Sequence, residues 1–187
     1  GEDGSWQGIK GSADYVKACC DASLKRLRTD YIDLYQIHRW DDNTPIDETL
    51  EALHDLVRGG KVRYIGASSM WAYQFSRSLY MADLRGWTRF ISMQNHYNLV
   101  YREEEREMIP FCIDQGIAVI PWSPLGGGLL GGALEKMETG RRSDESFVKT
   151  VESKRDQLQA YEDLCREIGL TRIEFAVASE PRSNAQQ

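Results

Sequence analysis

The sequence lacks the features that mark membrane-spanning, secreted and metal-binding proteins. It has no run of about eighteen apolar residues, the minimum length of a transmembrane helix. It has four cysteines and no Cys-x-x-Cys spacing, so reduced thiols are expected rather than a disulfide framework or a zinc site. The three histidines lack an i,i+4 spacing and have no obvious carboxylate partners, so no metal site is predicted.

An excess of positive charge is also lacking, which argues against a nucleic-acid-binding surface. The formal net charge is −6, and acids and bases alternate along the chain as on solvated helix faces. The N-terminal GEDGSWQG has neither an apolar signal core nor an initiating Met. We therefore expect a cytoplasmic protein without a membrane partner, whose sequence begins inside a longer reading frame or after a cleavage.

Four short apolar runs recur at regular spacing and predict strands. They cover residues 31–37, 61–67, 89–94 and 117–122, and none alternates cleanly between apolar and polar positions. Runs that are apolar on both faces are typical of parallel sheets covered by helices. Helical patterns fill the gaps, so the chain predicts an α/β protein of four strand–helix units.

Two of these helices have clear apolar stripes. The helix over residues 13–27 is expected to bury Val16, Cys20, Leu24 and Leu27. The next is expected to begin with Thr44 as its cap and Pro45 at its first position. Its predicted inner face consists of Ile46, Leu50, Leu53 and Val57.

The ends of the predicted strands decide between two ways of closing the sheet. A doubly wound sheet usually has a glycine-rich turn directly after its first strand, and the run at 31–37 has none. A (β/α)8 TIM barrel instead gathers polar residues at the carboxyl ends of its strands, as here in His38-Arg39, Ser68-Ser69, Gln94-Asn95-His96 and Trp122-Ser123. The barrel is favoured, and since eight units need about 250 residues, the chain holds roughly half of one.

Residues 125–151 differ from the rest of the chain. Gly126-Gly127-Gly128 and Gly131-Gly132 precede a polar stretch, which predicts a long mobile loop with a helix resuming near Lys154. Exposed amides among these glycines could cradle a phosphate, or the segment could be a flexible linker. Arg141 and Arg142 could clamp phosphates or form a solvated basic pair.

The polar strand ends also leave alternatives open. His38 could act as a general acid or base, orient a carbonyl, or simply bond to neighbouring backbone. Ser68, Ser69 and Gln94 could bond a planar amide, or the serines could cap the following helices. His54 and His96 are weaker candidates, because one lies on a predicted exposed helix face and the other lies beyond a strand end.

Four motifs in order resemble the aldo-keto reductase superfamily, near the branch that includes the potassium-channel beta subunits. They are SLKRLRTDYIDLYQIHRWD at 23–41, GKVRYIGASSM at 60–70, MQNHYNLVYREEE at 93–105 and IPWSPLGGGLLGG at 120–132. The resemblance implies that residues 1–187 are part of a single (β/α)8 barrel domain with NADP(H) across its mouth. It also implies reduction of aldehydes and ketones to alcohols by hydride transfer from nicotinamide C4.

The resemblance assigns roles to particular residues. His38 matches the histidine that orients the substrate carbonyl, and Trp122 matches the aromatic that stacks on the nicotinamide. Ser68, Ser69 and Gln94 match the residues around the nicotinamide carboxamide, and residues 125–151 match a loop on the cofactor side. The other matched cofactor residues are Ser123, Pro124, Leu125, Gly126, Gly127, Arg142, Arg182 and Gln186.

The chain also departs from the family pattern. The first three strands, which would carry the aspartate, the proton-donating tyrosine and its lysine, are not found, and the eighth strand is expected to be absent as well. The Gly-Lys-Tyr usual after the phosphate loop reads Gly132-Ala133-Leu134. One alternative is therefore a truncated or catalytically silent member that senses nucleotides or acts as a scaffolding subunit. Whether the protein forms a homo-oligomer is left open.

Overall fold

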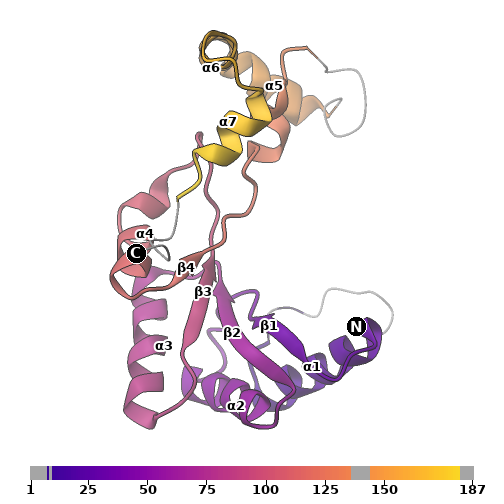
Figure 1. Cartoon of the computed structure of the whole chain (residues 1–187), viewed down its shortest axis with the longest axis vertical. Coiled ribbons are helices and arrows are strands. Elements are labelled where there is room, and N and C mark those ends of the chain that lie inside the picture. Colours follow the sequence, from indigo (N-terminus) through magenta and orange to yellow (C-terminus); the bar gives the residue numbers. More distant parts are fainter. Residues whose placement is uncertain (1–7, 9, 136–143, 182–187) are drawn as a thin grey trace. The chain divides into compact units, whose positions relative to one another are not determined.

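The computed structural model describes residues 8, 10–135 and 144–181, which fold into two compact units. The first unit contains the described residues of 1–95 and 105–120, and the second contains those of 96–104 and 121–182. Figure 1 labels the elements in chain order. In the first unit these are α1 (Ala13–Leu27), β1 (Ile32–Gln36), α2 (Ile46–Arg58), β2 (Val62–Ser68), α3 (Ala72–Arg85), β3 (Phe90–Gln94), α4 (Met108–Asp114) and β4 (Ala118–Val119).

All four predicted strands form, and they build one parallel sheet. The strand order is β1-β2-β3-β4, so each strand pairs with its neighbour in sequence. A doubly wound sheet would reverse its order at a switch point, whereas sequential order is that of a barrel wall. The fourth strand is much shorter than the predicted run of 117–122.

The two faces of this sheet differ in what covers them. On one face Ile65, Ala67 and Met93 are fully buried in the main core, together with apolar side chains of the helices. On the other face Tyr64 keeps 54% of its surface exposed. Side chains alternate between the two faces along each strand. One set is therefore covered by the helices, and the other set lies on the opposite face of the sheet. The predicted site residues Ser68 and Gln94 belong to the second set, in register with each other.

The two predicted helix stripes are partly correct. Val16 and Cys20 are buried on α1, but Leu27 is 64% exposed, because it lies in the last turn, where the chain leaves the helix through a left-handed Arg28. On α2, Ile46, Leu50 and Leu53 are buried as expected.

The start of α2 corrects the predicted cap. Pro45, rather than Thr44, occupies the N-cap position, and it makes no side-chain cap bond. The hydroxyl of Thr44 donates instead to Oδ2 of Asp41 at 2.6 Å, so it stabilises the loop that precedes the helix.

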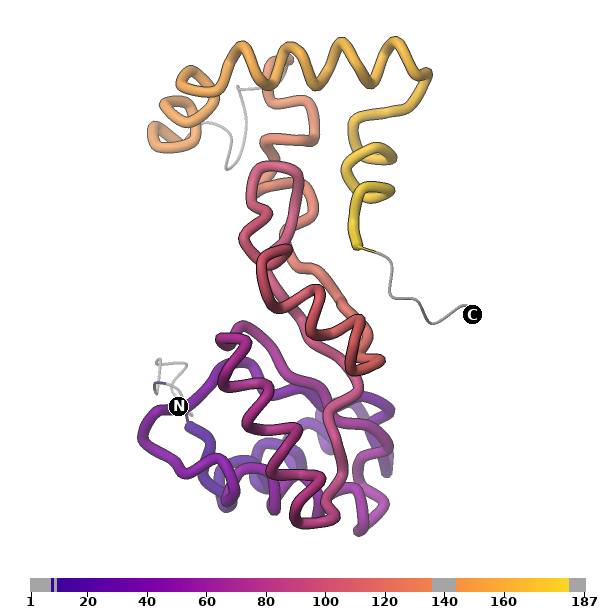
Figure 2. The backbone as a smooth tube through the Cα atoms, turned by 90° about the vertical axis from the view of Figure 1, so that its left-hand side faces the viewer, coloured from indigo at the N-terminus to yellow at the C-terminus, as the bar shows by residue number. Residues whose placement is uncertain are grey.

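The second unit is mainly helical. It contains the 3-10 helix η2 (Gly126–Gly131) and the helices α5 (Glu145–Ser153), α6 (Arg155–Glu167) and α7 (Arg172–Ala178). A small core of Leu129, Ala133, Val151 and Leu158 joins η2, α5 and α6. Figure 2 traces α6 and α7 as two helices that meet at a sharp bend, where Gly169 has a φ of 72°.

This helical content corrects the loop predicted for residues 125–151. A helix begins at Arg155, next to the predicted Lys154, but another already begins at Glu145, because Asp144 caps it by accepting a bond from the Ser146 amide at 2.8 Å. The apolar side of α5 packs Val151 into the small core. The many polar residues of this stretch mask its capping signal and its three apolar positions.

Three other expectations can be compared with the described residues. None of the four cysteines forms a disulfide, and Cys20, Cys112 and Cys165 are buried. In the part of the chain that the structure describes, no helix is both long and apolar enough to cross a membrane. Those residues also contain no cluster of three or more metal-ligating side chains.

Candidate functional site

Ser68, Ser69 and Gln94 lie together at the carboxyl ends of β2 and β3. The Ser68 hydroxyl donates to the backbone oxygen of Gln94 at 2.8 Å, and the Ser69 amide donates to the same oxygen at 3.1 Å. The two serine hydroxyls are 3.2 Å apart. Neither serine caps the next helix, because α3 has Trp71 as its N-cap residue and the side chain of Gln74 bonds the Trp71 amide. The helix-cap alternative is therefore wrong.

Three neighbouring residues of the sheet, two positions before Ser68 and Gln94 in β2 and β3, are not evident from the sequence. Gln36, Gly66 and Ser92 are direct register partners across β1, β2 and β3. The Ser92 hydroxyl donates to Oε1 of Gln36 at 3.2 Å, and Nε2 of Gln36 donates to Oε1 of Gln94 at 3.1 Å. These two hydrogen bonds connect the buried Ser92, through Gln36, to the predicted cofactor residue Gln94.

Gly66 makes this row possible. Side chains two strands apart are separated by nearly 10 Å, so a residue between them normally keeps them apart. A Cβ at Gly66 would lie 2.4 Å from the Ser92 hydroxyl and 2.9 Å from Cγ of Gln36. The β2–β3 register also shifts between Ile65 and Gly66, and such irregularities are common next to functional sites.

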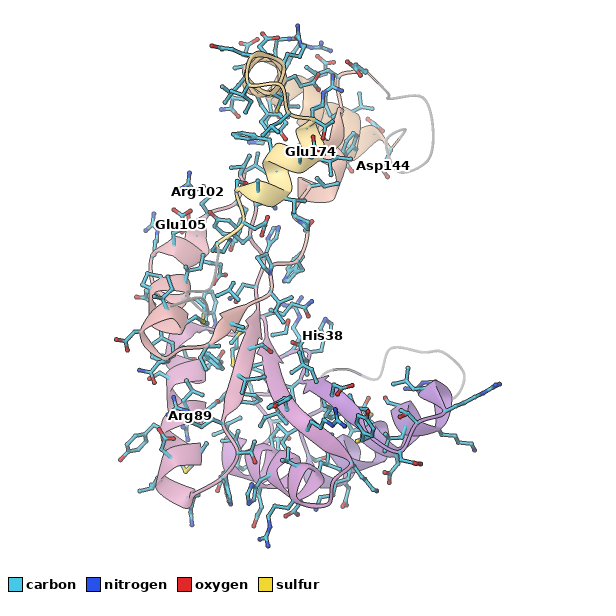
Figure 3. The ribbon with its side chains drawn as sticks, viewed as in Figure 1. His38, Arg89, Arg102, Glu105, Asp144 and Glu174 are labelled. Carbon is cyan, nitrogen blue, oxygen red and sulfur yellow. The ribbon has the colours of Figure 1, made fainter. Side chains whose placement is uncertain are left out.

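His38 follows β1 and points away from the bulk of the sheet (Figure 3). Its side chain is exposed and lines a cavity of about 240 Å³ together with Gln36, Trp40 and Asp41. Because Gln36 lines this cavity and also bonds Gln94, it connects the surroundings of His38 to the serine and glutamine cluster.

A tyrosine in the same cavity is poorly suited to donate a proton. The Tyr35 hydroxyl donates to the backbone oxygen of Val16 at 3.3 Å. Burial raises the pKa of Tyr35 well above its ordinary value. A group that keeps its proton so firmly is a weak general acid near neutral pH.

Asp41 holds the loop that follows His38. Its Oδ2 accepts the Gly11 amide at 2.8 Å, and its Oδ1 accepts the Asn43 amide at 3.0 Å. The hydrogen bond from Thr44, together with the backbone bonds from Asn43 and Gly11, lowers the pKa of Asp41 despite its partial burial. The Asp41 carboxylate therefore connects the loop after β1 to the backbone at Gly11, just before α1.

In the second unit, Trp122 belongs to a stack of three rings. The imidazole of His96 lies between the indole of Trp122 and the ring of Tyr101, with centroid distances of 4.1 Å and 4.3 Å. His96 and Trp122 also form a parallel β-bridge. Burial lowers the pKa of His96, which favours the neutral ring. From the sequence alone His96 is a weak candidate, because it lies beyond a strand end.

Asn98 connects this stack to the segment after Trp122. Its Nδ2 lies 3.0 Å from the backbone oxygen of Ser123, to which it donates, and 3.3 Å from Nε2 of His96. Its Oδ1 accepts the Val100 amide at 3.0 Å. Asn98 is buried, so its polar atoms depend on these partners.

The segment that begins at Ser123 has an unusual backbone. Ser123 has a φ of 62°, and Gly126, Gly127 and Gly128 all have positive φ. Positive φ is rare outside glycine and is often found at functional sites, and the other two non-glycine cases described are Arg28 and Ser69. Among the described residues, the amides of Leu125 and Gly127 have no hydrogen-bond partner. Two donors thus remain available on one short loop.

The glycines at 126–131 also have the Gly-x-Gly-x-x-Gly spacing of dinucleotide-binding turns. They follow the fourth strand rather than the first, and they form a 3-10 helix rather than opening an α-helix. The spacing alone therefore does not indicate a doubly wound sheet.

Two sets of predicted residues remain to be placed. Arg141, Arg142, Arg182 and Gln186 lie outside the described residues. His54 is half-buried on α2 rather than exposed, and its Nδ1 accepts the Thr88 amide at 3.1 Å. His54 therefore has a structural role.

Comparison with known proteins assigns the fold to a family. The Aldo/keto reductase family matches residues 2–178. An aldo-keto reductase of Fusarium vanettenii is 56% identical over 126 residues, which are 67% of this chain and 34% of that protein. An aldo-keto reductase of Alternaria alternata is 54% identical over 129 residues, which are 64% of this chain and 35% of that protein.

A longer match extends over more of the chain. The versiconal hemiacetal acetate reductase of Aspergillus parasiticus is 43% identical over 173 residues, which are 89% of this chain and 50% of that protein. The chain thus spans between about a third and a half of the length of these relatives. With its sequentially ordered parallel strands, this chain belongs to the aldo/keto reductase family and forms part of its (β/α)8 barrel.

Proposed function

We propose that the protein is an NADP(H)-dependent oxidoreductase that reduces aldehydes or ketones to alcohols. The observation that carries this proposal is the cluster of Gln94, Ser68 and Ser69 at neighbouring strand ends. When bound, NADP(H) supplies the hydride from its nicotinamide C4. The residues of this chain bind and orient the reactants.

The donors and acceptors of the cluster suit a carboxamide. Gln94 has its Oε1 occupied by Gln36, and among the described residues its Nε2 has no partner. It can therefore donate to a carbonyl oxygen. The hydroxyl hydrogen of Ser68 is directed at the Gln94 backbone, so a lone pair of Ser68 can accept from an amide NH2. A primary carboxamide offers one such oxygen and one such NH2.

Taken by itself, the second unit also holds groups that suit a nicotinamide nucleotide. Trp122 is stacked against His96, and an indole held in this way is suited to stack on a nicotinamide. The unbonded amides of Leu125 and Gly127 are suited to donate to pyrophosphate oxygens, as backbone amides in left-handed loops do. The path of this loop is set by Ser123, Pro124 and Gly126.

His38 supplies a donor for the reacting carbonyl. Reduction builds negative charge on the carbonyl oxygen, and a donor already held at that position lowers the barrier. His38 lies at the end of β1 beside a cavity, and Asp41 fixes the loop that follows it. Orientation of the carbonyl is therefore the role that fits its position.

A reducing compartment suits the thiols. Cys20, Cys112 and Cys165 are buried and form no disulfide, as expected for a protein of the cytoplasm. The proposed setting is therefore cytoplasmic.

The proposal is tested by steady-state kinetics of the purified protein at its native length. NADPH should be oxidised when an aromatic aldehyde is added, and the alcohol should accumulate in equal amount. NADPH binding without turnover would contradict the enzymatic role and favour a nucleotide-sensing or scaffolding subunit. Absence of both binding and turnover would contradict the proposal as a whole.

A further inference from the structure

The bonds between Ser92, Gln36 and Gln94 have a direction. Ser92 donates its hydroxyl hydrogen to Oε1 of Gln36, which leaves the Gln36 NH2 facing Gln94. Nε2 of Gln36 then donates to Oε1 of Gln94. A serine hydroxyl can donate or accept, but two facing amides must pair a donor with an acceptor, so the orientation of Gln36 fixes which way Gln94 is turned.

The surroundings hold this arrangement in place. Ser92 is buried, with 2% of its surface exposed, so its hydroxyl depends on a protein partner. The absence of a side chain at Gly66 is what lets Gln36 and Ser92 approach each other across β2. Gln36 is therefore held between Ser92 and Gln94 by a hydrogen bond at each end of its amide.

We propose that Gln36 is a positioning residue that turns the Gln94 amide so that its NH2 faces the carbonyl oxygen of the nicotinamide carboxamide. Gln36 acts through Gln94 and does not itself touch the cofactor. This inference rests on the proposed function, since it names the orientation of a residue within the proposed cofactor site. It predicts that Gln94 recognises the oxygen of the carboxamide rather than its nitrogen.

The prediction distinguishes two cofactors of equal charge. The 3-acetylpyridine analogue of NADP+ keeps the carbonyl oxygen but has a methyl group in place of the NH2. With Gln94 turned as the structure has it, its bond to the oxygen is available in both cofactors. The ratio of the dissociation constants for the analogue and for NADP+ therefore reports which end of Gln94 faces the ligand.

Gln36→Glu reverses the direction of the bonds. A carboxylate only accepts, so Gln94 must turn its NH2 toward Glu and its Oε1 toward the cofactor. That oxygen can bond the carboxamide NH2 but not the methyl group of the analogue. The ratio of dissociation constants should rise about threefold to tenfold above that of the wild type, the value of one hydrogen bond between uncharged groups.

Gln115→Glu is the matched control. Gln115 is an exposed glutamine that accepts a bond from Arg89 outside the proposed site, so the same change there should leave the ratio as in the wild type. If Gln36 had only a structural role, Gln36→Glu would weaken both cofactors equally and leave the ratio unchanged. A folded Gln36→Glu protein with the wild-type ratio would overturn the inference.

A second, uncharged variant decides the question if Gln36→Glu does not fold. Gln36→Leu should weaken NADP+ binding about threefold in the wild-type background, since the Gln94 amide is no longer held. In the Gln94→Ala background the same change should have no further effect. Equal losses in both backgrounds would overturn the inference. A wild-type protein that binds neither cofactor would instead contradict the proposed function, so the two failures are distinguishable.

Discussion

The imidazole of His96 lies flat against the indole of Trp122, with ring centroids 4.1 Å apart and ring planes inclined by 12°. Tyr101 covers the other face of His96, with an inclination of 18°. The indole is therefore held at a fixed angle by its own neighbours. A rigid aromatic plane is what stacking on a nicotinamide requires.

Trp122→Ala should weaken NADPH binding by about twofold to tenfold, because one aromatic stacking contact contributes about 0.5–1.5 kcal/mol. The dissociation constant can be measured by titration of the protein with NADPH. Trp71→Ala is the matched control, since Trp71 is 71% exposed at the start of α3 and lies outside the proposed site. Equal affinities for the wild type and Trp122→Ala would contradict the stacking role.

Acidification should destabilise the ring stack. Burial lowers the pKa of His96 in the folded protein below its ordinary value of about 6.5. The unfolded chain thus takes up the proton first, so the contribution of neutral His96 to the free energy of unfolding falls as the pH drops below about 6.5.

His96→Gln should remove this part of the pH dependence. Denaturant unfolding of both proteins, at neutral and at mildly acidic pH, would measure the difference. If the wild type and the variant lost the same free energy of unfolding on acidification, the buried imidazole would not be its source.

His38→Ala should lower turnover more than it changes NADPH affinity. Loss of one preorganised donor at a developing oxyanion reduces turnover by about a hundredfold or more. Steady-state turnover and the NADPH dissociation constant should be compared for the variant and the wild type. A change confined to the dissociation constant would refute the role of His38. His54→Ala is the control. His54 lies on α2 and bonds Thr88, so this variant should keep near-normal turnover.

Gly66→Ala should lower the free energy of unfolding by about 1–3 kcal/mol, the usual effect of overpacking. The added Cβ would lie 2.4 Å from the Ser92 hydroxyl and 2.9 Å from Oε1 of Gln36. Adding Ser92→Ala to this variant removes the nearest clash and should recover part of the loss. The free energies of unfolding would be measured by denaturant unfolding. If the effects of Gly66→Ala and Ser92→Ala simply added, the Cβ at position 66 would not meet the Ser92 hydroxyl.

The strands of the sheet could be predicted because the sequence signals that mark them are local. Runs that are apolar on both faces identify β1, β2 and β3 within a residue or two, and the polar residues after them mark the carboxyl ends. Ser68 and Gln94 were found for the same reason, since each directly ends a strand.

Gln36, Gly66 and Ser92 were missed because only the register brings them together. Gln36 lies some thirty residues from Gly66, and nothing in the sequence near it specifies its partner. The stack of His96 on Trp122 likewise depends on a bridge between distant segments. The helix at Glu145 was missed for a different reason, because a short helix with few apolar positions is stabilised by its cap and by packing rather than by a strong pattern.

The most direct test of the proposed chemistry follows a labelled hydrogen. NADPH carrying deuterium at the transferred position of nicotinamide C4 would be incubated with the native-length protein and an aromatic aldehyde, and the alcohol would be analysed by mass spectrometry. We predict one deuterium on the carbinol carbon of each alcohol molecule formed. Alcohol without deuterium, or no alcohol while NADPH is bound, would contradict reduction by hydride transfer.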